Sequence, residues 1–229
     1  PRTVEYRQGA LYDGDYRIDL IYKRVLITEL IERMGVDNPI VQAVRNHDVC
    51  MVNPFTCKLL YKKASLAVLS DERNAELFSA EETYVIHEHI PWTRVVEERT
   101  TNYKGLPIDL IPFLQKYREQ FVLKPNDDYG GRGIVLGWQT NSSGWEAALQ
   151  TALETPHVVQ ERVTIPTEPY PSIIDGKLQI FDRMLDPAPF VFHGEYTAGC
   201  RTRLSTDPLL NVSAGGGSTV PTFIVEKRD

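Results

Sequence analysis

Lys124 and the glycine-rich loop behind it are the residues best suited to bind an anion. Lys124 ends an apolar segment, and Gly130, Gly131 and Gly133 follow shortly after it. Glycines in such a loop let main-chain N–H groups approach an anion closely, and the lysine adds a fixed positive charge. The loop is neither a Walker motif, since no Gly-Lys-Ser/Thr follows, nor a Rossmann fingerprint, since it leads into a strand. A plain hairpin with an exposed lysine is the alternative.

Two other segments place polar groups beside strand ends or glycines. Residues 160–163, Gln-Glu-Arg-Val, end a predicted strand, where Glu161 and nearby main-chain groups could bind the edge of an adenine. A solvated strand end is the alternative. Arg203, Asn211 and the glycines 215–217 form a second group typical of phosphate binding, for which a surface turn is the alternative.

Other kinds of catalytic site find little support. His87 and His89 alternate along the chain just after a predicted strand at 83–86 and would share a face in a strand, but no third ligand follows at a spacing suited to a metal. The chain has no Gly-x-Ser-x-Gly motif and no cysteine with a convincing histidine partner, so nucleophilic hydrolysis is not indicated. The three cysteines are too few for a disulfide framework, and we expect buried thiols in a reducing cytoplasm.

Composition limits the partners. The 229 residues are 42% hydrophobic and 24% charged, which suffices for a real core. No run of 18 apolar residues occurs, so we expect no membrane span. With 25 basic and 31 acidic residues the net charge is −6, and no basic run occurs, so we expect no nucleic-acid partner. The start of the chain is polar and does not resemble a signal peptide.

The elements that position these groups follow from the residue pattern. Residues 1–22 alternate apolar and polar side chains around a turn at 13–15, which predicts a hairpin. Helices are expected at about 58–70, with Leu59, Leu60, Leu66 and Leu69 on one face, and at 110–120. A third is expected from an N-cap at Ser142 or Ser143 to about 153. Strands are expected at 48–52, 83–86, 120–124, 134–138, 158–163, 177–185, 189–193, 195–205 and 222–225. This mixture predicts the α/β or α+β class.

In this order, the segments resemble a known superfamily. The strand ending in Lys124, the glycine hairpin, the helix and residues 158–163 resemble the nucleotide lid of ATP-grasp proteins. Lys62-Lys63-Ala64 is similar to the superfamily's first ATP lysine, and Arg203, Asn211 and the glycines 215–217 are similar to triphosphate-binding residues of amine-ligating members. Residues 16–24, 52–54 and 121–133 resemble bacterial circularly permuted ATP-grasp proteins related to glutathionylspermidine synthase.

The resemblance implies a fold, a ligand and a set of roles. It implies a permuted ATP-grasp fold with two lobes around a nucleotide cleft, divided into an N-terminal part (1–120), a lid (121–165) and a C-terminal lobe (166–229). By the same resemblance, the predicted site residues bind ATP: phosphate ligands Lys63, Lys124, Gly130, Gly131, Gly133, Gly215 and Gly216; adenine ligands Gln160, Glu161 and the Val163 main chain; and Arg203 and Asn211 at the transferring phosphoryl group.

The magnesium motif of the superfamily has no convincing copy here. ATP-grasp enzymes hold Mg²⁺ with an acidic residue on one strand and a Glu-x-Asn on the next. Glu72-Arg73-Asn74 lacks the flanking strand, and Met51 stands where the segment 50–53 would need Glu. Asp19 is a weaker candidate ligand. Either the metal ligands lie upstream of Pro1 or the protein has lost them. The abrupt start of the chain favours the first explanation, so we expect the chain to be part of a longer protein.

The resemblance implies an ATP-dependent carboxylate–amine ligase. Such an enzyme activates a small-molecule or peptide carboxylate as an acyl phosphate, which an amine then attacks. The alternatives are a non-catalytic nucleotide-binding or scaffold module, favoured by the missing Glu-x-Asn, and an interaction domain that merely keeps the fold.

Overall fold

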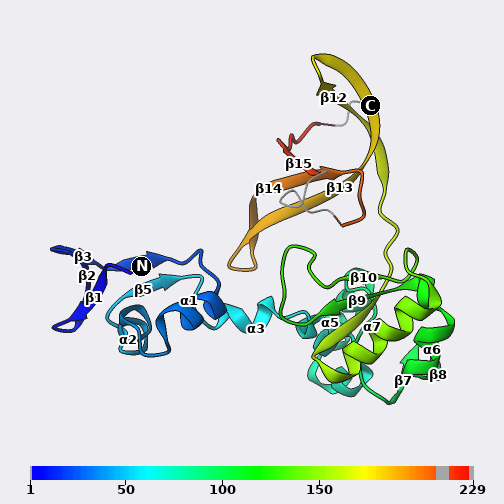
Figure 1. The fold of residues 1–229 in the computed structure, drawn as a ribbon, viewed down its shortest axis with the longest axis horizontal. Coiled ribbons are helices and arrows are strands. Elements are labelled where there is room, and N and C mark those ends of the chain that lie inside the picture. The colour runs from blue at the N-terminus through cyan, green and yellow to red at the C-terminus, as the bar shows by residue number, and fades with distance from the viewer. Residues whose placement is uncertain (1, 210–216, 227–229) are drawn as a thin grey trace. The chain divides into compact units, whose positions relative to one another are not determined.

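Helices and strands mix along the whole chain, as the sequence predicts. The computed structural model describes residues 2–209 and 217–226, and its class is mixed α/β, or α+β (Figure 1). The chain divides into two compact units, Pro1–Ser65 and Leu66–Asp229, which are described separately. The boundaries predicted at 120/121 and 165/166 both lie inside the second unit.

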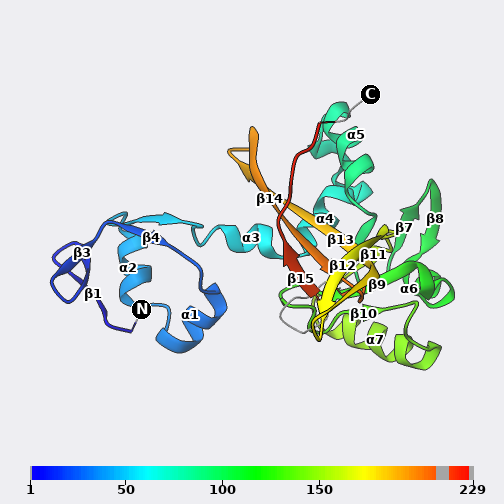
Figure 2. The same cartoon turned by 90° about the horizontal axis from the view of Figure 1, so that it is seen from above.

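The first unit is built on short strands and helices. Strands β1 (Val4–Arg7), β2 (Ala10–Asp13) and β3 (Tyr16–Ile18) form an antiparallel meander, and β4 (Leu20–Tyr22) pairs in parallel with β5 (Cys50–Val52). The helices are α1 (Ile27–Met34), α2 (Pro39–Arg45) and α3 (Cys57–Tyr61) (Figure 2), and α2 packs against β1 and β2. The core is apolar and comprises Leu11, Leu30, Ile40, Ala43 and Val49.

Helix α2, which the sequence analysis did not predict, begins at a polar cap followed by a proline. The Asn38 side chain accepts a hydrogen bond from the Val41 N–H at 3.1 Å, and Pro39 occupies the first helical position. A polar cap and a proline at that position satisfy or remove N–H groups that a helix start leaves unpaired.

The second unit contains the strand–loop–strand segment of interest. Its main sheet has the order β10-β9-β11-β6, with β6 (Thr93–Val95), β9 (Phe121–Pro125), β10 (Val135–Leu136) and β11 (His157–Glu161), and each neighbouring pair is antiparallel. Helices α6 (Leu110–Lys116) and α7 (Ser142–Glu154) pack against it, and 3₁₀ helix η2 (Arg118–Gln120) precedes β9 (Figure 1). Helices α4 (Ala64–Ser70) and α5 (Ala80–His89), 3₁₀ helix η1 (Glu72–Leu77) and the hairpin β7 (Thr100–Tyr103) with β8 (Leu106–Asp109) complete this part.

A second antiparallel sheet follows β11. Its order is β12-β13-β14-β15, with β12 (Thr167–Ile174), β13 (Lys177–Phe192), β14 (Tyr196–Ser205) and β15 (Gly217–Val220). Asp186 of β13 lies directly opposite Arg203 of β14 in this pairing.

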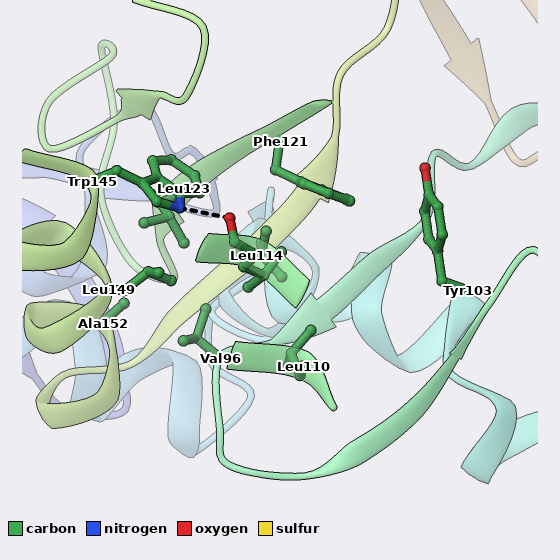
Figure 3. Packing of buried hydrophobic residues seen from close by; sticks show 10 residues of the cluster. Val96, Tyr103, Leu110, Leu114, Phe121, Leu123, Trp145, Leu149 and Ala152 are labelled. Atoms are coloured by element: carbon green, nitrogen blue, oxygen red, sulfur yellow. Dashed lines mark hydrogen bonds between the residues drawn. The ribbon is translucent and has the colours of Figure 1, made fainter. Parts of the chain in front are cut away.

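Side chains that alternate along β9 and β11 point in turn into the hydrophobic core and to the opposite face of the sheet. Phe121, Leu123 and Val159 belong to the buried cluster that packs on α6 and α7. Trp145 of α7 is fully buried there, and its Nε1 donates a hydrogen bond to the Leu114 carbonyl at 2.9 Å (Figure 3). Because successive side chains of a strand point to opposite faces, Val122, Lys124 and Gln160 are placed on the other face of the sheet.

Several expected elements differ in the structure, for local reasons. The strand expected at 83–86 is wrong, because residues 80–89 form α5. The helix starts at a capping box in which Ser79 Oγ accepts from the Glu82 N–H at 3.2 Å and Glu82 Oε2 accepts from the Ser79 N–H at 2.8 Å. Reciprocal bonds of this kind favour a helix start over a strand. His87 and His89, two residues apart on a helix, do not share a face.

The helix expected at 58–70 is broken. It forms as α3 and α4, because Lys62 adopts an extended conformation with φ −70° and ψ 134°. Leu59 and Leu60 are 71% and 80% exposed, so the single apolar face predicted for this helix is also wrong. The turn expected at 13–15 joins β2 to β3, and a further turn at Gln8–Gly9 makes three strands of the predicted hairpin.

Further differences concern the helix cap, the last strands and the cysteines. Helix α7 is capped by Asn141, whose Oδ1 accepts from the Gly144 N–H at 2.8 Å, and not by either serine. The strands expected at 177–185 and 189–193 form one strand, β13, with a bulge at 190/191. Residues 222–225 form no strand, and β12 was not predicted. The expectation of buried thiols is wrong for Cys50 and Cys57, which are both exposed. Cys50 is exposed because Met51 is the residue of β5 that turns inward, and Cys57 begins α3, which has no buried residue.

Candidate functional site

The strand–loop–strand segment forms one wall of a cavity of about 430 Å³ in the second unit, which we name the hairpin cavity. Volumes of this size are typical of small-ligand pockets. Seven of the predicted site residues line it, although they come from three separate segments of the chain: Lys124, Gly130, Gly131, Gln160, Glu161, Val163 and Arg203.

Lys124 is held in this cavity by a buried neighbour. Its Nζ donates a 2.6 Å hydrogen bond to Oε1 of Gln160, which is 7% exposed. Gln160 Nε2 in turn donates to Oγ1 of the fully buried Thr93 at 2.9 Å. Both ends of the Gln160 amide are therefore engaged, so Gln160 positions the Lys124 ammonium rather than offering its amide to a ligand.

The glycine-rich loop adopts conformations that need glycine. Gly130, Gly131 and Gly133 have φ values of 67°, 79° and 67°, which side-chain-bearing residues rarely adopt. Gly133 does not line the cavity but lies against β9, where a Cβ would come within 2.7 Å of Pro125 Cγ. Gly130 and Gly131 thus contribute main chain to the cavity, and Gly133 allows the loop to close on its own strand.

Glu161 presents its carboxylate away from Lys124. Its Oε1 accepts hydrogen bonds from the Tyr103 hydroxyl at 2.8 Å and from Lys104 Nζ at 2.7 Å. Burial and then the hydrogen bond to Glu161 raise the pKa of Tyr103, and the same carboxylate raises the pKa of Lys104. Glu161 and Gln160 are successive residues of one strand, which explains why they serve opposite faces.

Arg203 brings a second cation to the cavity from the second sheet. Its guanidinium forms an ion pair with the carboxylate of Asp186 on the neighbouring strand. A guanidinium carries five N–H donors, so it can bind an oxyanion while keeping an ion pair.

The remaining wall is apolar and aromatic, and the sequence analysis did not identify it. Trp138 lies under the Arg162 guanidinium at 4.3 Å from the ring centroid, and both line the cavity. Leu136, Ile134 and Ile165 complete this wall. Leu136 pairs with Val122 and therefore lies on the same face of the sheet as Val122 and Lys124. The alternation of side chains along the strands could have identified Leu136 as a residue of this wall.

The other predicted site residues lie elsewhere. Lys63 belongs to the first unit, in the break between α3 and α4. Asn211, Gly215 and Gly216 lie outside the described residues. Within residues 2–209 and 217–226, no group of three or more His, Cys, Asp or Glu side chains is arranged to hold a metal ion. No helix in the same ranges is long and apolar enough to cross a membrane.

Comparison of the chain with protein-family models and with curated proteins finds no match in either set. What the hairpin cavity offers is an ammonium and a guanidinium, two glycines of positive φ whose main chain lines it, and an aromatic wall capped by Arg162. That combination suits a ligand with both an anionic part and a flat apolar part.

Proposed function

We propose that the hairpin cavity binds ATP and that the chain is the ATP-binding part of an ATP-grasp carboxylate–amine ligase. The observation that carries the proposal is the convergence of Lys124, Gly130, Gly131 and Arg203 on one cavity with an aromatic wall. A nucleoside triphosphate has the matching chemistry, because its phosphates are anionic and its base is flat and apolar.

The cavity residues divide by chemistry. The Lys124 ammonium neutralises phosphate charge, and the main chain of Gly130 and Gly131 lies close to the same oxygens. The Trp138 ring and the Arg162 guanidinium supply a stacking surface for the base. The N–H of Val163, which makes no main-chain hydrogen bond within the described residues, donates to the base edge.

The proposed reaction has two steps. A carboxylate oxygen attacks the γ-phosphorus, the bond to the bridging oxygen breaks, and ADP leaves with that electron pair. An amine then attacks the acyl carbon, phosphate leaves, and the amine loses a proton. Arg203 stabilises the negative charge on the transferring phosphoryl group. In members of this superfamily Mg²⁺ neutralises phosphate charge. The described residues offer no complete magnesium site, and neither step is assigned to a residue that would bind the metal.

Nucleotide binding is tested with Lys124→Met in calorimetric titrations with ATP. Hydrogen bonds to charged groups are worth about 1.5–3 kcal/mol, so the Kd should rise about 10- to 100-fold. The matched control is Lys116→Met, because Lys116 is a lysine of the same unit that does not line the cavity. An ATP affinity that Lys124→Met leaves unchanged would contradict the proposed site.

Ligase chemistry is tested by trapping the acyl phosphate. Hydroxylamine attacks an acyl phosphate to give a hydroxamate, which is measured by its iron(III) complex, so the amine substrate need not be known. A panel of carboxylic acids with ATP and Mg²⁺ should give hydroxamate with at least one acid. ATP binding without hydroxamate from any acid, in this chain and in any longer chain that contains it, would favour a non-catalytic nucleotide-binding module.

A further inference from the structure

A second cavity, of about 750 Å³, lies in the same unit and is not used by the proposed function. We name it the lateral cavity. Its walls come from α4, η1 and α5 on one side and from the start of β6, the β7–β8 turn and the end of β11 on the other. Glu161 is the residue that it shares with the hairpin cavity.

One wall of the lateral cavity is apolar and fixed in position. Leu69, Phe78, Ile86 and Ile90 line it, together with Trp92. The Trp92 Nε1 donates to the Asn102 carbonyl at 2.8 Å, and the Arg94 guanidinium lies 4.6 Å from the centroid of its ring. A hydrocarbon or aromatic group can be buried against this wall without displacing a polar contact.

The lining of the cavity next to Trp92 includes the Asn102 amide, which is held in place and has spare donors. Asn102 is anchored through its N–H to Glu72 at 3.3 Å, and through its Oδ1 by the Gly105 N–H at 2.8 Å. Its Nδ2, among the described residues, donates no hydrogen bond. An amide fixed in this way can donate to an oxygen of a ligand at little cost in side-chain entropy.

Beside this amide lies an ion pair that is only partly engaged. Lys104 Nζ bonds Glu161 Oε1 at 2.7 Å, and the Tyr103 hydroxyl bonds the same oxygen. No contact of the other oxygen, Oε2, is found within residues 2–209 and 217–226, and the Lys104 side chain is 66% exposed. The pair therefore offers both a positive donor and a negative acceptor to a ligand.

The two other carboxylates that line this cavity are bound by arginines of the protein. Asp71 is bound by Arg73 and Arg99 at 2.9 and 2.6 Å, and Glu72 is bound by Arg94 and Arg99, each at 2.6 Å. A ligand with a single charge would meet an opposite and a like charge together at Lys104 and Glu161. A ligand that carries both charges satisfies them both.

We propose that the lateral cavity binds a free α-amino acid with an apolar side chain. The ligand's carboxylate accepts from Lys104 Nζ and Asn102 Nδ2, its ammonium donates to Glu161 Oε2, and its side chain packs against Phe78, Ile86 and Trp92. This inference does not depend on nucleotide binding in the hairpin cavity.

The test is calorimetric titration with three probes that share one apolar group. L-Phenylalanine carries both charges, 3-phenylpropanoate lacks the ammonium, and L-phenylalaninamide lacks the carboxylate. Phenylalanine should bind with a Kd in the millimolar range or below, and about tenfold more tightly than either analogue. No saturable binding of phenylalanine, or equal binding of an analogue, would overturn the proposal.

Two variants locate the binding. Lys104→Met and Glu161→Gln should each weaken phenylalanine binding about tenfold. Lys104→Met should leave the binding of L-phenylalaninamide unchanged, and Glu161→Gln should leave the binding of 3-phenylpropanoate unchanged. Lys116→Met is the matched control, since Lys116 lies 5.0 Å from the Tyr117 ring as Lys104 does from the Tyr103 ring. Circular dichroism checks that each variant is folded. If Lys104→Met unfolds, the phenylalanine titration of Glu161→Gln tests the proposal. Phenylalanine binding that survives in a folded variant of either residue would place the site elsewhere.

Discussion

Gly137, just after β10, is a position where adding one methyl group should strongly destabilise the structure. An alanine Cβ there would lie 1.8 Å from the main-chain oxygen of Arg118 and 2.8 Å from that of Phe121. Both obstacles are backbone atoms, so relief requires movement of η2 or β9 rather than rotation of a side chain. Two hydrogen bonds depend on the same approach: the Gly137 N–H donates to the Phe121 carbonyl at 3.0 Å, and Arg118 Nη1 donates to the Gly137 carbonyl at 2.6 Å.

The cost of Gly137→Ala can be summed from these contacts. Overpacking costs about 1–3 kcal/mol, and each hydrogen bond lost adds about 1 kcal/mol. A destabilisation of about 3 kcal/mol lowers the Tm of a unit of this size by about 6–12 °C. Because Gly137 separates Leu136 from Trp138, which both line the hairpin cavity, ATP affinity should fall as well.

Thermal unfolding followed by far-ultraviolet circular dichroism measures this effect. Gly131→Ala is the control, because it adds the same methyl group where no atom lies within 4 Å. Its φ of +79° still costs an alanine about 1 kcal/mol. A Gly137→Ala protein that unfolds at the same temperature as Gly131→Ala would refute the reasoning.

Three further predictions concern charge, base stacking and helix capping. Burial acts to raise the pKa of Asp71, but hydrogen bonds from Arg99 and Arg73 outweigh it and hold that pKa well below its ordinary value. The ionised form therefore stabilises the fold above about pH 4, and this stability is lost as the pH falls through the lowered pKa. Asp71→Asn should cost about 3 kcal/mol at pH 7 and clearly less at pH 2–3, as measured by urea unfolding; an equal cost at both pH values would contradict this. Trp138→Ala should weaken ATP binding but not binding of inorganic triphosphate, measured by calorimetry, because the proposed site stacks the base on its ring; equal losses for both would assign it another role. Asn141→Ala should destabilise the fold by about 1 kcal/mol through the lost α7 cap, whereas Ser143→Ala should have little effect in the same unfolding assay.

The sequence predicts the segment around Lys124 well because its signals are local. An apolar strand, a run of glycines and a polar helix cap each act within a few residues, and β9, β10, α7 and β11 form close to the expected positions. Strand alternation then determines which side chains share a face, so Lys124 and Gln160 could be placed together once their strands were known to pair.

Other features depend on contacts that no local pattern records. Residues 83–86 were predicted to form a strand, but the Ser79–Glu82 capping box commits that segment to α5. Gln160 and Glu161 were assigned one role, although adjacent residues of a strand face opposite ways, and Glu161 is engaged by Tyr103 and Lys104 from a hairpin 58 positions away in the chain. The Trp138–Arg162 stack was missed because it joins two strand ends that only the sheet pairing brings together.

Calorimetric titration of ATP into the unmodified chain, first with Mg²⁺ and then with EDTA, tests the central claim most directly. The account predicts saturable binding of one ATP per chain, lost or strongly weakened in Lys124→Met. Binding that weakens in EDTA would show that the chain itself carries magnesium ligands. Absence of ATP binding in both conditions would contradict the assignment of the hairpin cavity as a nucleotide site.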